Sequence, residues 1–288
     1  SANYAVDNCD LLLVIGERLQ LTQTSFNYKD FAKDAFKMMV DIDPAEMHKK
    51  TIKIDVPIHC DAKYFLEELY KQKIKLNRWE VKVKPINPAD FQGNKKYLNV
   101  YKFLEELSKN THSYDVVTAN AMASVTTHQV LKITQGQRFI TNAGLGHMGS
   151  GLPMAIGASI ANHKKPVICM EGDGSIMLNI HELQTVVHHN LPLKIFIFNN
   201  NGYFSMKVTH KAFFKKIFAS SPETGVSLPN FEKLSYAWGI KYFKITKDKD
   251  LQNIKKIINY KGPVICELIL DPDQPMPPKW SAGQLKVS

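Results

Sequence analysis

Two short polar segments, each following a long apolar run, carry residue types suited to holding a metal ion and a phosphate group. Segment 171–175 reads EGDGS after the apolar run 166–170, and segment 199–202 reads NNNG after the run 193–198. If the two runs are adjacent parallel strands, Asp173 and Asn200 face one point at the carboxyl edge of the sheet. Their oxygen atoms are hard ligands of the kind that Mg²⁺ prefers, often together with phosphate oxygens. The glycines beside Asp173 would let backbone N–H groups approach such phosphates.

A third segment, 144–151, reads GLGHMGSG and matches the pattern G-x-G-x-x-G. One interpretation is a dinucleotide-binding loop, with Glu171 at the end of the next strand holding a ribose. Another is a glycine-rich turn that lets a helix pack closely against a strand. The pattern alone leaves both open.

The elements that must position these segments alternate between strands and helices, which predicts the α/β class with mostly parallel, doubly wound sheets. Strands are expected at 10–15, 37–42, 52–55, 114–119, 137–142, 166–171, 193–198, 241–245 and 263–270. Helices are expected at 61–71, 98–108, 124–133, 150–162, 179–190, 230–238 and 249–259. Unbroken apolar runs such as 11–15 suit strands that are buried on both faces.

These elements predict two domains joined by a linker. Residues 1–71 supply only three strands and one or two helices, so we interpret them as the C-terminal part of a Rossmann-like middle domain. Residues 72–97 are rich in Lys and Asn, lack a clear period and suit a linker. Residues 98–288 carry a full set of strands and helices and all three polar segments.

Composition excludes several classes of function. The net charge is +10, but only three of the 37 cationic residues are arginines, and the lysines are scattered. We therefore expect a solvated surface and no nucleic acid partner. The sequence has no run of 18 apolar residues, so no membrane span is expected. The four distant cysteines suit reduced thiols and a cytoplasmic protein, and a start at Ser1 suggests a chain that begins inside a longer one.

The motifs together resemble those of thiamine diphosphate enzymes, in particular the acetolactate synthase-like group. The resemblance rests on Gly172-Asp173-Gly174 with Asn199-Asn200, on the loop 142–153 and on the helix motifs 182–185 and 190–192. Segment 41–46 resembles the end of that group's middle domain. The resemblance implies a thiamine diphosphate-binding fold, thiamine diphosphate and Mg²⁺ as cofactors, and a reaction between a pyruvate-like 2-oxo acid and a carbonyl acceptor. It leaves the binding of FAD unknown.

The resemblance also assigns roles to single residues. It implies that Mg²⁺ is held by Asp173, Asn200 and the carbonyl of Gly202. It implies that Met148 bends the cofactor and that the carbonyl of Gly146 accepts a hydrogen bond from the aminopyrimidine. His147 lies in the same loop, where it either contacts the substrate as a catalytic residue or holds the loop in place. The remaining cofactor-binding residues that the resemblance implies are Gly172, Gly174, Ser175, Ala121, Met122 and Tyr203.

Two segments depart from the family pattern. Residues 120–124 read NAMAS where the family often has a glycine followed by Gln-His, and residues 203–210 differ from the substrate mouth of true acetolactate synthases. Segment 220–231 is more similar to proteins of cell-surface sugar synthesis, so a sugar-modifying carboligase is one alternative. A non-catalytic fragment that holds the cofactor is another. No segment corresponds to the pyrimidine-binding domain, so the catalytic glutamate is expected from another part or copy in a homo-oligomer.

Overall fold

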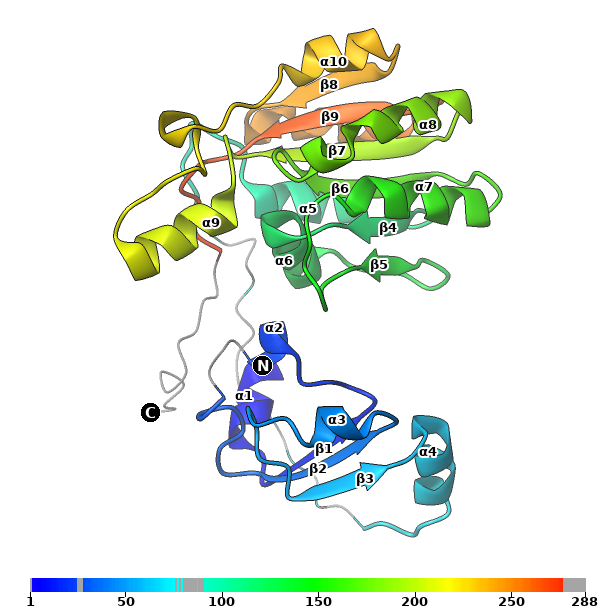
Figure 1. Ribbon diagram of the computed structural model, residues 1–288. Coiled ribbons are helices and arrows are strands. Elements are labelled where there is room, and N and C mark those ends of the chain that lie inside the picture. The colour runs from blue at the N-terminus through cyan, green and yellow to red at the C-terminus, as the bar shows by residue number, and fades with distance from the viewer. Residues whose placement is uncertain are drawn as a thin grey trace. The chain divides into compact units, whose positions relative to one another are not determined.

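The computed structural model describes residues 2–24, 28–75, 77, 79, 87 and 91–276, and the chain divides between residues 86 and 87 into two compact units. Parallel strands flanked by helices make up both units (Figure 1), which confirms the α/β class. In the described residues no helix is both long and apolar enough to span a membrane.

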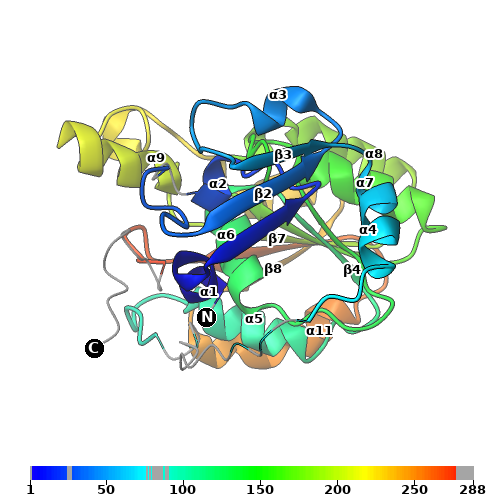
Figure 2. The same cartoon turned by 90° about the horizontal axis from the view of Figure 1, so that it is seen from below.

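The smaller unit is built on a parallel three-stranded sheet in the order β1-β2-β3 (Figure 2). Its strands are β1 (Leu11–Ile15), β2 (Phe36–Asp41) and β3 (Val56–His59), and its helices are α1 (Ala2–Asn8), α2 (Leu21–Thr24), α3 (Pro44–Met47) and α4 (Ala62–Tyr70). A small apolar core forms around Val14, Met39 and Met47.

The prediction of a strand at 52–55 is wrong, because the third strand lies at 56–59. Ile52 is buried in the apolar core as part of a loop. The Asp55 side chain accepts a hydrogen bond from the backbone N–H of Lys37 at 2.9 Å, just before the strand begins. Pro57 concealed the true strand, since proline is depleted in sheets and tolerated mainly on edge strands such as β3.

The larger unit holds a parallel six-stranded sheet in the order β5-β4-β6-β7-β9-β8. Its strands are β4 (Asp115–Thr118), β5 (Phe139–Thr141), β6 (Val167–Gly172), β7 (Leu193–Asn199), β8 (Lys241–Ile245) and β9 (Val264–Ile269). Its α-helices are α5 (Val100–Ser108), α6 (Ala121–Val130), α7 (Gly151–Ala161), α8 (Leu183–His188), α9 (Phe204–Thr209), α10 (Phe231–Ala237) and α11 (Ile254–Ile258).

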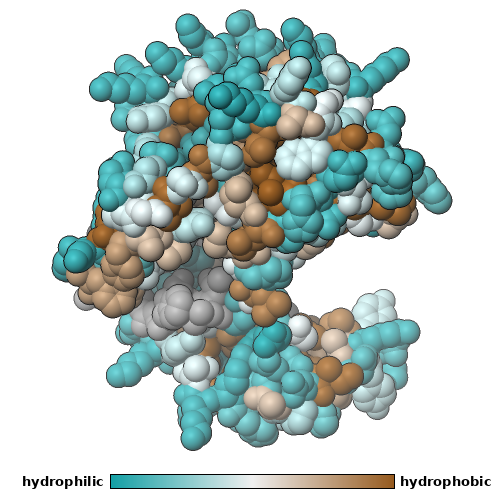
Figure 3. All heavy atoms as spheres, turned by 45° about the horizontal axis from the view of Figure 1, so that its top comes forward, coloured by the Kyte–Doolittle hydropathy of each residue, from teal (hydrophilic) through white to brown (hydrophobic). Residues whose placement is uncertain are grey.

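Helices cover both faces of this sheet, as expected for a doubly wound fold. Residues of α5, α6 and α11 pack with one set of alternating strand side chains, which includes Phe196 and Phe198. Residues of α7, α8 and α10 pack with the other set, which includes Ile195 and Ile197. Both faces of β7 are therefore buried, which explains why its residues from Ile195 to Phe198 are all apolar. Hydrophilic side chains cover much of the larger unit, the upper part of Figure 3.

The helix expected over 179–190 is divided in the structure. It begins as a short 3-10 helix, η3 (Ile180–Glu182), and continues as α8. Asn179 lies outside both, and its side-chain amide donates to the carbonyl of Gly149 at 2.7 Å. The backbone of Asn179, at φ −136° and ψ 28°, is not helical, so the helical segment begins one residue later than expected. The expected helix 249–259 likewise begins as a 3-10 helix, η6 (Asp248–Asn253), before α11.

Candidate cofactor site

The candidate site lies where β6 and β7 end side by side. These strands pair in parallel, and their register places Gly172 opposite Phe198. Asp173 and Asn200 follow within two residues of that pair, so the fold brings the two proposed metal ligands to one edge of the sheet.

Asp173 is buried and its carboxylate is held by backbone N–H groups. Oδ2 accepts from the N–H groups of Asn200 at 3.1 Å and Gly202 at 3.0 Å, and Oδ1 accepts from that of Gly174 at 2.7 Å. Burial raises the pKa of Asp173 to about 6, and these three hydrogen bonds act in the opposite direction. A cation at this position would favour the charged form of the carboxylate.

Asn200 carries a buried side-chain oxygen that lacks a partner in the described part of the chain. The residue is only 4% exposed, and its Oδ1 has no hydrogen-bond partner among the described residues. A buried oxygen without a partner is costly. A metal ion next to Asp173 would supply the missing partner, so the residues present fit Mg²⁺. The part of the chain that the structure describes holds no cluster of three His, Cys, Asp or Glu side chains. The proposed ligand set contains only one such side chain.

Close packing around two glycines shapes the turn. A Cβ atom on Gly174 would lie 2.1 Å from Cε1 of Tyr203, so the tyrosine ring lies directly against this glycine. Gly202 has φ of +127°, and a Cβ there would lie 2.4 Å from the carbonyl oxygen of Ser220. A side chain at Gly174 would displace the ring of Tyr203, and one at Gly202 would displace the backbone at Ser220.

A cavity of about 70 Å³ brings most of the predicted cofactor residues together. Its lining includes nine of them: Ala121, Met122, Met148, Gly172, Asp173, Gly174, Ser175, Asn200 and Tyr203. Sites for whole cofactors usually enclose about 300–1,000 Å³. This cavity is therefore large enough for only part of a cofactor molecule.

Three other predicted residues do not line the cavity. Gly146 and His147 are exposed on the glycine-rich loop, and Gly202 contributes to the turn behind it. The carbonyl of Gly146 is near Asn120, whose Nδ2 donates to it at 3.4 Å. His147 Nδ1 lies 3.3 Å from Nδ2 of Asn142, which also donates to the backbone carbonyl of His147.

Ala121 adopts an unusual backbone conformation at the rim of the cavity. Its φ is +50°, in the left-handed region that disfavours residues with a Cβ atom. This is the segment that departs from the family pattern. Strain of this kind collects at binding sites when the surrounding structure maintains it.

Glu171 connects segment 171–175 with the glycine-rich loop, a contact that the sequence does not predict. Its side chain is fully buried, and it accepts a hydrogen bond from Ser175 Oγ at 2.7 Å. That hydroxyl in turn accepts from the N–H of Gly149 at 2.9 Å, in the glycine-rich loop. Burial raises the pKa of Glu171 to about 8. Its place directly before Gly172 was visible in the sequence, but its contacts were not.

These contacts disfavour the dinucleotide interpretation of the glycine-rich loop. That interpretation required Glu171 to hold a ribose, whereas the carboxyl group is enclosed. A Cβ on Gly151 would lie 1.9 Å from Oε2 of Glu171, so the start of α7 packs directly on this side chain. Strands β5 and β6 are also separated by β4 in the sheet.

Lys207 is a second residue that the sequence did not reveal. This lysine of α9 is buried, and its ammonium group donates to the carbonyls of Asn200 at 3.3 Å and Pro272 at 3.1 Å. Burial lowers its pKa, while its positive charge favours the charged form of Asp173. Lysines in helices are usually solvated, so its type and position gave no signal.

The geometry thus defines an α/β protein with a candidate site for a metal ion and a diphosphate at the edge of its sheet. Residues 120–268 match the family model for the C-terminal TPP-binding domain of thiamine pyrophosphate enzymes, and residues 1–69 match the model for their central domain. Thiamine pyrophosphate and thiamine diphosphate are two names for the same compound. The chain belongs to the thiamine pyrophosphate enzymes.

Several curated proteins are similar to this chain over most of its length. The acetolactate synthase large subunit of Cyanidium caldarium is 33% identical over 93% of this chain and 48% of its own length. The acetolactate synthase isozyme 2 large subunit of Escherichia coli (strain K12) is 32% identical over 94% of this chain and 50% of its own. The probable acetolactate synthase large subunit of Methanocaldococcus jannaschii is 29% identical over 99% of this chain and 50% of its own length. The chain spans about half the length of these relatives.

Proposed function

We propose that this chain holds the diphosphate of thiamine diphosphate through Mg²⁺, as part of an enzyme that decarboxylates a 2-oxo acid and joins the product to a carbonyl acceptor. The observation that carries the proposal is the buried Oδ1 of Asn200, which has no partner among the described residues. The backbone N–H of the same residue donates to the carboxylate of Asp173, and both residues line the cavity. The relatives named as acetolactate synthase large subunits support the reaction class.

In this proposal the chain's own residues divide the work. Asp173, Asn200 and the carbonyl of Gly202 would hold Mg²⁺, and the backbone around Gly174 would face the diphosphate. Met148 would support the bent form of the cofactor, and the carbonyl of Gly146 would orient its aminopyrimidine. When bound, thiamine diphosphate would supply a nucleophilic carbon and an electron sink. The chain's contribution is then to position groups and to neutralise charge.

The proposal includes an organisation for the whole enzyme. Residues 1–71 would be the end of the middle domain, 72–97 a linker and 98–288 the diphosphate-binding domain, in a cytoplasmic homo-oligomer. The small cavity supports the view that another domain or subunit completes the site. The chain alone should therefore release negligible carbon dioxide from pyruvate. Rapid release by the 288-residue chain, with its mass confirmed, would contradict this organisation.

A calorimetric titration of the chain with thiamine diphosphate tests the binding proposal. Binding should require Mg²⁺ and be lost in EDTA, because the metal joins Asp173 and Asn200 to the phosphates. Asn200→Ala should weaken binding by about tenfold or more, since it removes a metal ligand. Asn259→Ala is the matched control, because it removes an exposed amide at the end of α11. Equal affinity with and without Mg²⁺ would refute the metal assignment.

A further inference from the structure

A second hollow of the larger unit lies at the same edge of the sheet, beyond the ends of β8 and β9. Leu98 pairs with Leu270 directly after β9, and its N–H donates to the carbonyl of Ile269 at 3.1 Å. Asn99, the next residue, donates through its backbone N–H to Oδ1 of Asp248 at 2.9 Å, just after β8. Carboxyl ends of parallel strands are where ligands bind in open α/β sheets.

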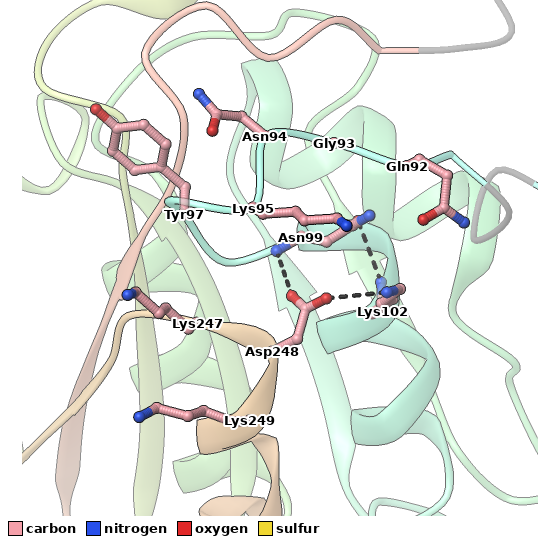
Figure 4. A pocket seen from close by; sticks show the side chains of 10 residues that line it. All are labelled: Gln92, Gly93, Asn94, Lys95, Tyr97, Asn99, Lys102, Lys247, Asp248 and Lys249. Carbon is pink, nitrogen blue, oxygen red and sulfur yellow. Dashed lines mark hydrogen bonds and ion pairs between the residues drawn. The ribbon is translucent and has the colours of Figure 1, made fainter.

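The hollow has a volume of about 300 Å³, within the range of small-molecule sites. Three segments line it (Figure 4): residues 92–97, the first turn of α5 and the start of η6. None of its lining residues lines the cavity at Asp173. It is therefore separate from the proposed cofactor site.

The charge of the lining is strongly positive. It contains four lysines, Lys95, Lys102, Lys247 and Lys249, and a single acidic residue, Asp248. Lys102 forms an ion pair with Asp248 at 2.9 Å, which uses the one carboxylate (Figure 4). Among the described residues the other three lysines have no ion pair within 4.0 Å. The nearby carboxylate of Asp250 is bound to Thr246 and to the backbone N–H of Lys247.

The polar groups at the base of the hollow are fixed in place. Asn99 Oδ1 accepts from the backbone N–H groups of Tyr101 and Lys102, so it caps α5. Its Nδ2 donates to the carbonyl of Phe91 at 2.6 Å. These groups are therefore already bound within the protein. The side chains left to contact a ligand are Lys95, Lys247, Lys249, Tyr97 and the amide of Asn94, whose Oδ1 accepts from the N–H of Lys96 at 3.1 Å (Figure 4).

We propose that this hollow binds a small molecule that carries a diphosphate or a similar cluster of negative charges. Several ammonium groups around one concave surface repel one another, and an anion with two or more charges relieves that repulsion. Lysine binds phosphate as a point charge without strict geometry, which suits flexible side chains on three segments. Asn94 and the ring of Tyr97 would contact the organic part of such a ligand.

The test uses inorganic pyrophosphate and ADP as probes, in EDTA so that no metal-dependent binding at Asp173 contributes. Isothermal titration calorimetry at low ionic strength should show binding that weakens as salt is added. The double variant Lys247→Gln/Lys249→Gln should weaken it by about tenfold, since each lost charge-assisted contact lowers affinity. The control variant Lys255→Gln/Lys256→Gln makes the same change of charge on exposed positions of α11.

Two further binding measurements distinguish this site from the proposed cofactor site. Asp173→Ala should leave pyrophosphate binding in EDTA unchanged, and Lys247→Gln/Lys249→Gln should leave Mg²⁺-dependent binding of thiamine diphosphate unchanged. Equal weakening by the two lysine pairs would show a general charge effect and overturn the proposal. No heat of binding from either probe at millimolar concentration would also overturn it.

Discussion

Lys194 provides the sharpest test of the electrostatics of the larger unit. This residue of β7 is only 1% exposed, and its ammonium group donates to the carbonyls of Tyr260 at 2.5 Å and Gly262 at 2.7 Å. Burial lowers the pKa of Lys194 from 10.5 to about 8. The unfolded chain therefore binds more protons than the folded chain between these two values.

The sign and size of the effect follow from proton linkage. Because the unfolded state binds more protons, the free energy of unfolding gains a contribution from Lys194 as the pH rises. This contribution should grow by about 2 kcal/mol between about pH 7 and pH 9.5, and approach about 3 kcal/mol at higher pH. Buried thiols act in the opposite direction, since burial raises the pKa of Cys169 and Cys266.

A comparison with Lys194→Met isolates the lysine from these other groups. Urea unfolding at a series of pH values gives the free energy of unfolding by linear extrapolation. Between about pH 7 and pH 9.5 the free energy of unfolding of the wild type should rise by about 2 kcal/mol relative to that of Lys194→Met. Lys241→Met, on the exposed start of β8, should show no such change. Parallel curves for wild type and Lys194→Met would refute the reasoning.

Two further predictions concern backbone and packing, and both are checked by thermal and urea unfolding. Gly151→Ala should destabilise the protein by about 1–3 kcal/mol, because its Cβ would lie 1.9 Å from Oε2 of Glu171. Gly157→Ala, on the same helix with nothing within 4 Å, should be neutral or stabilising by up to about 1 kcal/mol, and equal losses at both positions would contradict the packing argument. Ala121→Gly should stabilise by about 0.5–1 kcal/mol, because it relieves the strain of φ +50°. A loss of stability there would show that the conformation is not strained.

The edge of the sheet at which the candidate site lies could be predicted from the sequence because the strands before it are buried on both faces. Runs such as 166–170 and 195–198 are apolar without alternation, and a polar segment follows each at once. Parallel pairing of the two runs predicts that Asp173 and Asn200 lie at one edge of the sheet. The observed register of β6 and β7 brings them to the same edge. Their roles as metal ligands remain a prediction.

Other features depended on tertiary contacts that no local pattern reports. The strand at 56–59 contains Pro57, and the low strand propensity of proline concealed this strand in the sequence. Lys207 is polar and helical, and only the folded chain shows that it is buried against the carbonyl of Asn200. Helix α9, which carries it, lies in the segment interpreted as a substrate mouth, and no helix was expected there.

Glu171 shows why a motif can indicate a site without revealing how the site is held. In the sequence it is one acidic residue before a glycine, and a ribose contact was a reasonable interpretation. In the fold its carboxyl group accepts from Ser175, and Ser175 accepts from Gly149, so one buried side chain connects two loops that are far apart in sequence. Gly151 has to be small because this carboxyl group lies against it. Gly151 stands just outside the pattern G-x-G-x-x-G, and the last pattern glycine, Gly149, lies against Leu178 and Asn179, so both positions are small because protein side chains pack on them. Because the carboxyl group of Glu171 is enclosed by the protein, the pattern gives no support to a dinucleotide here.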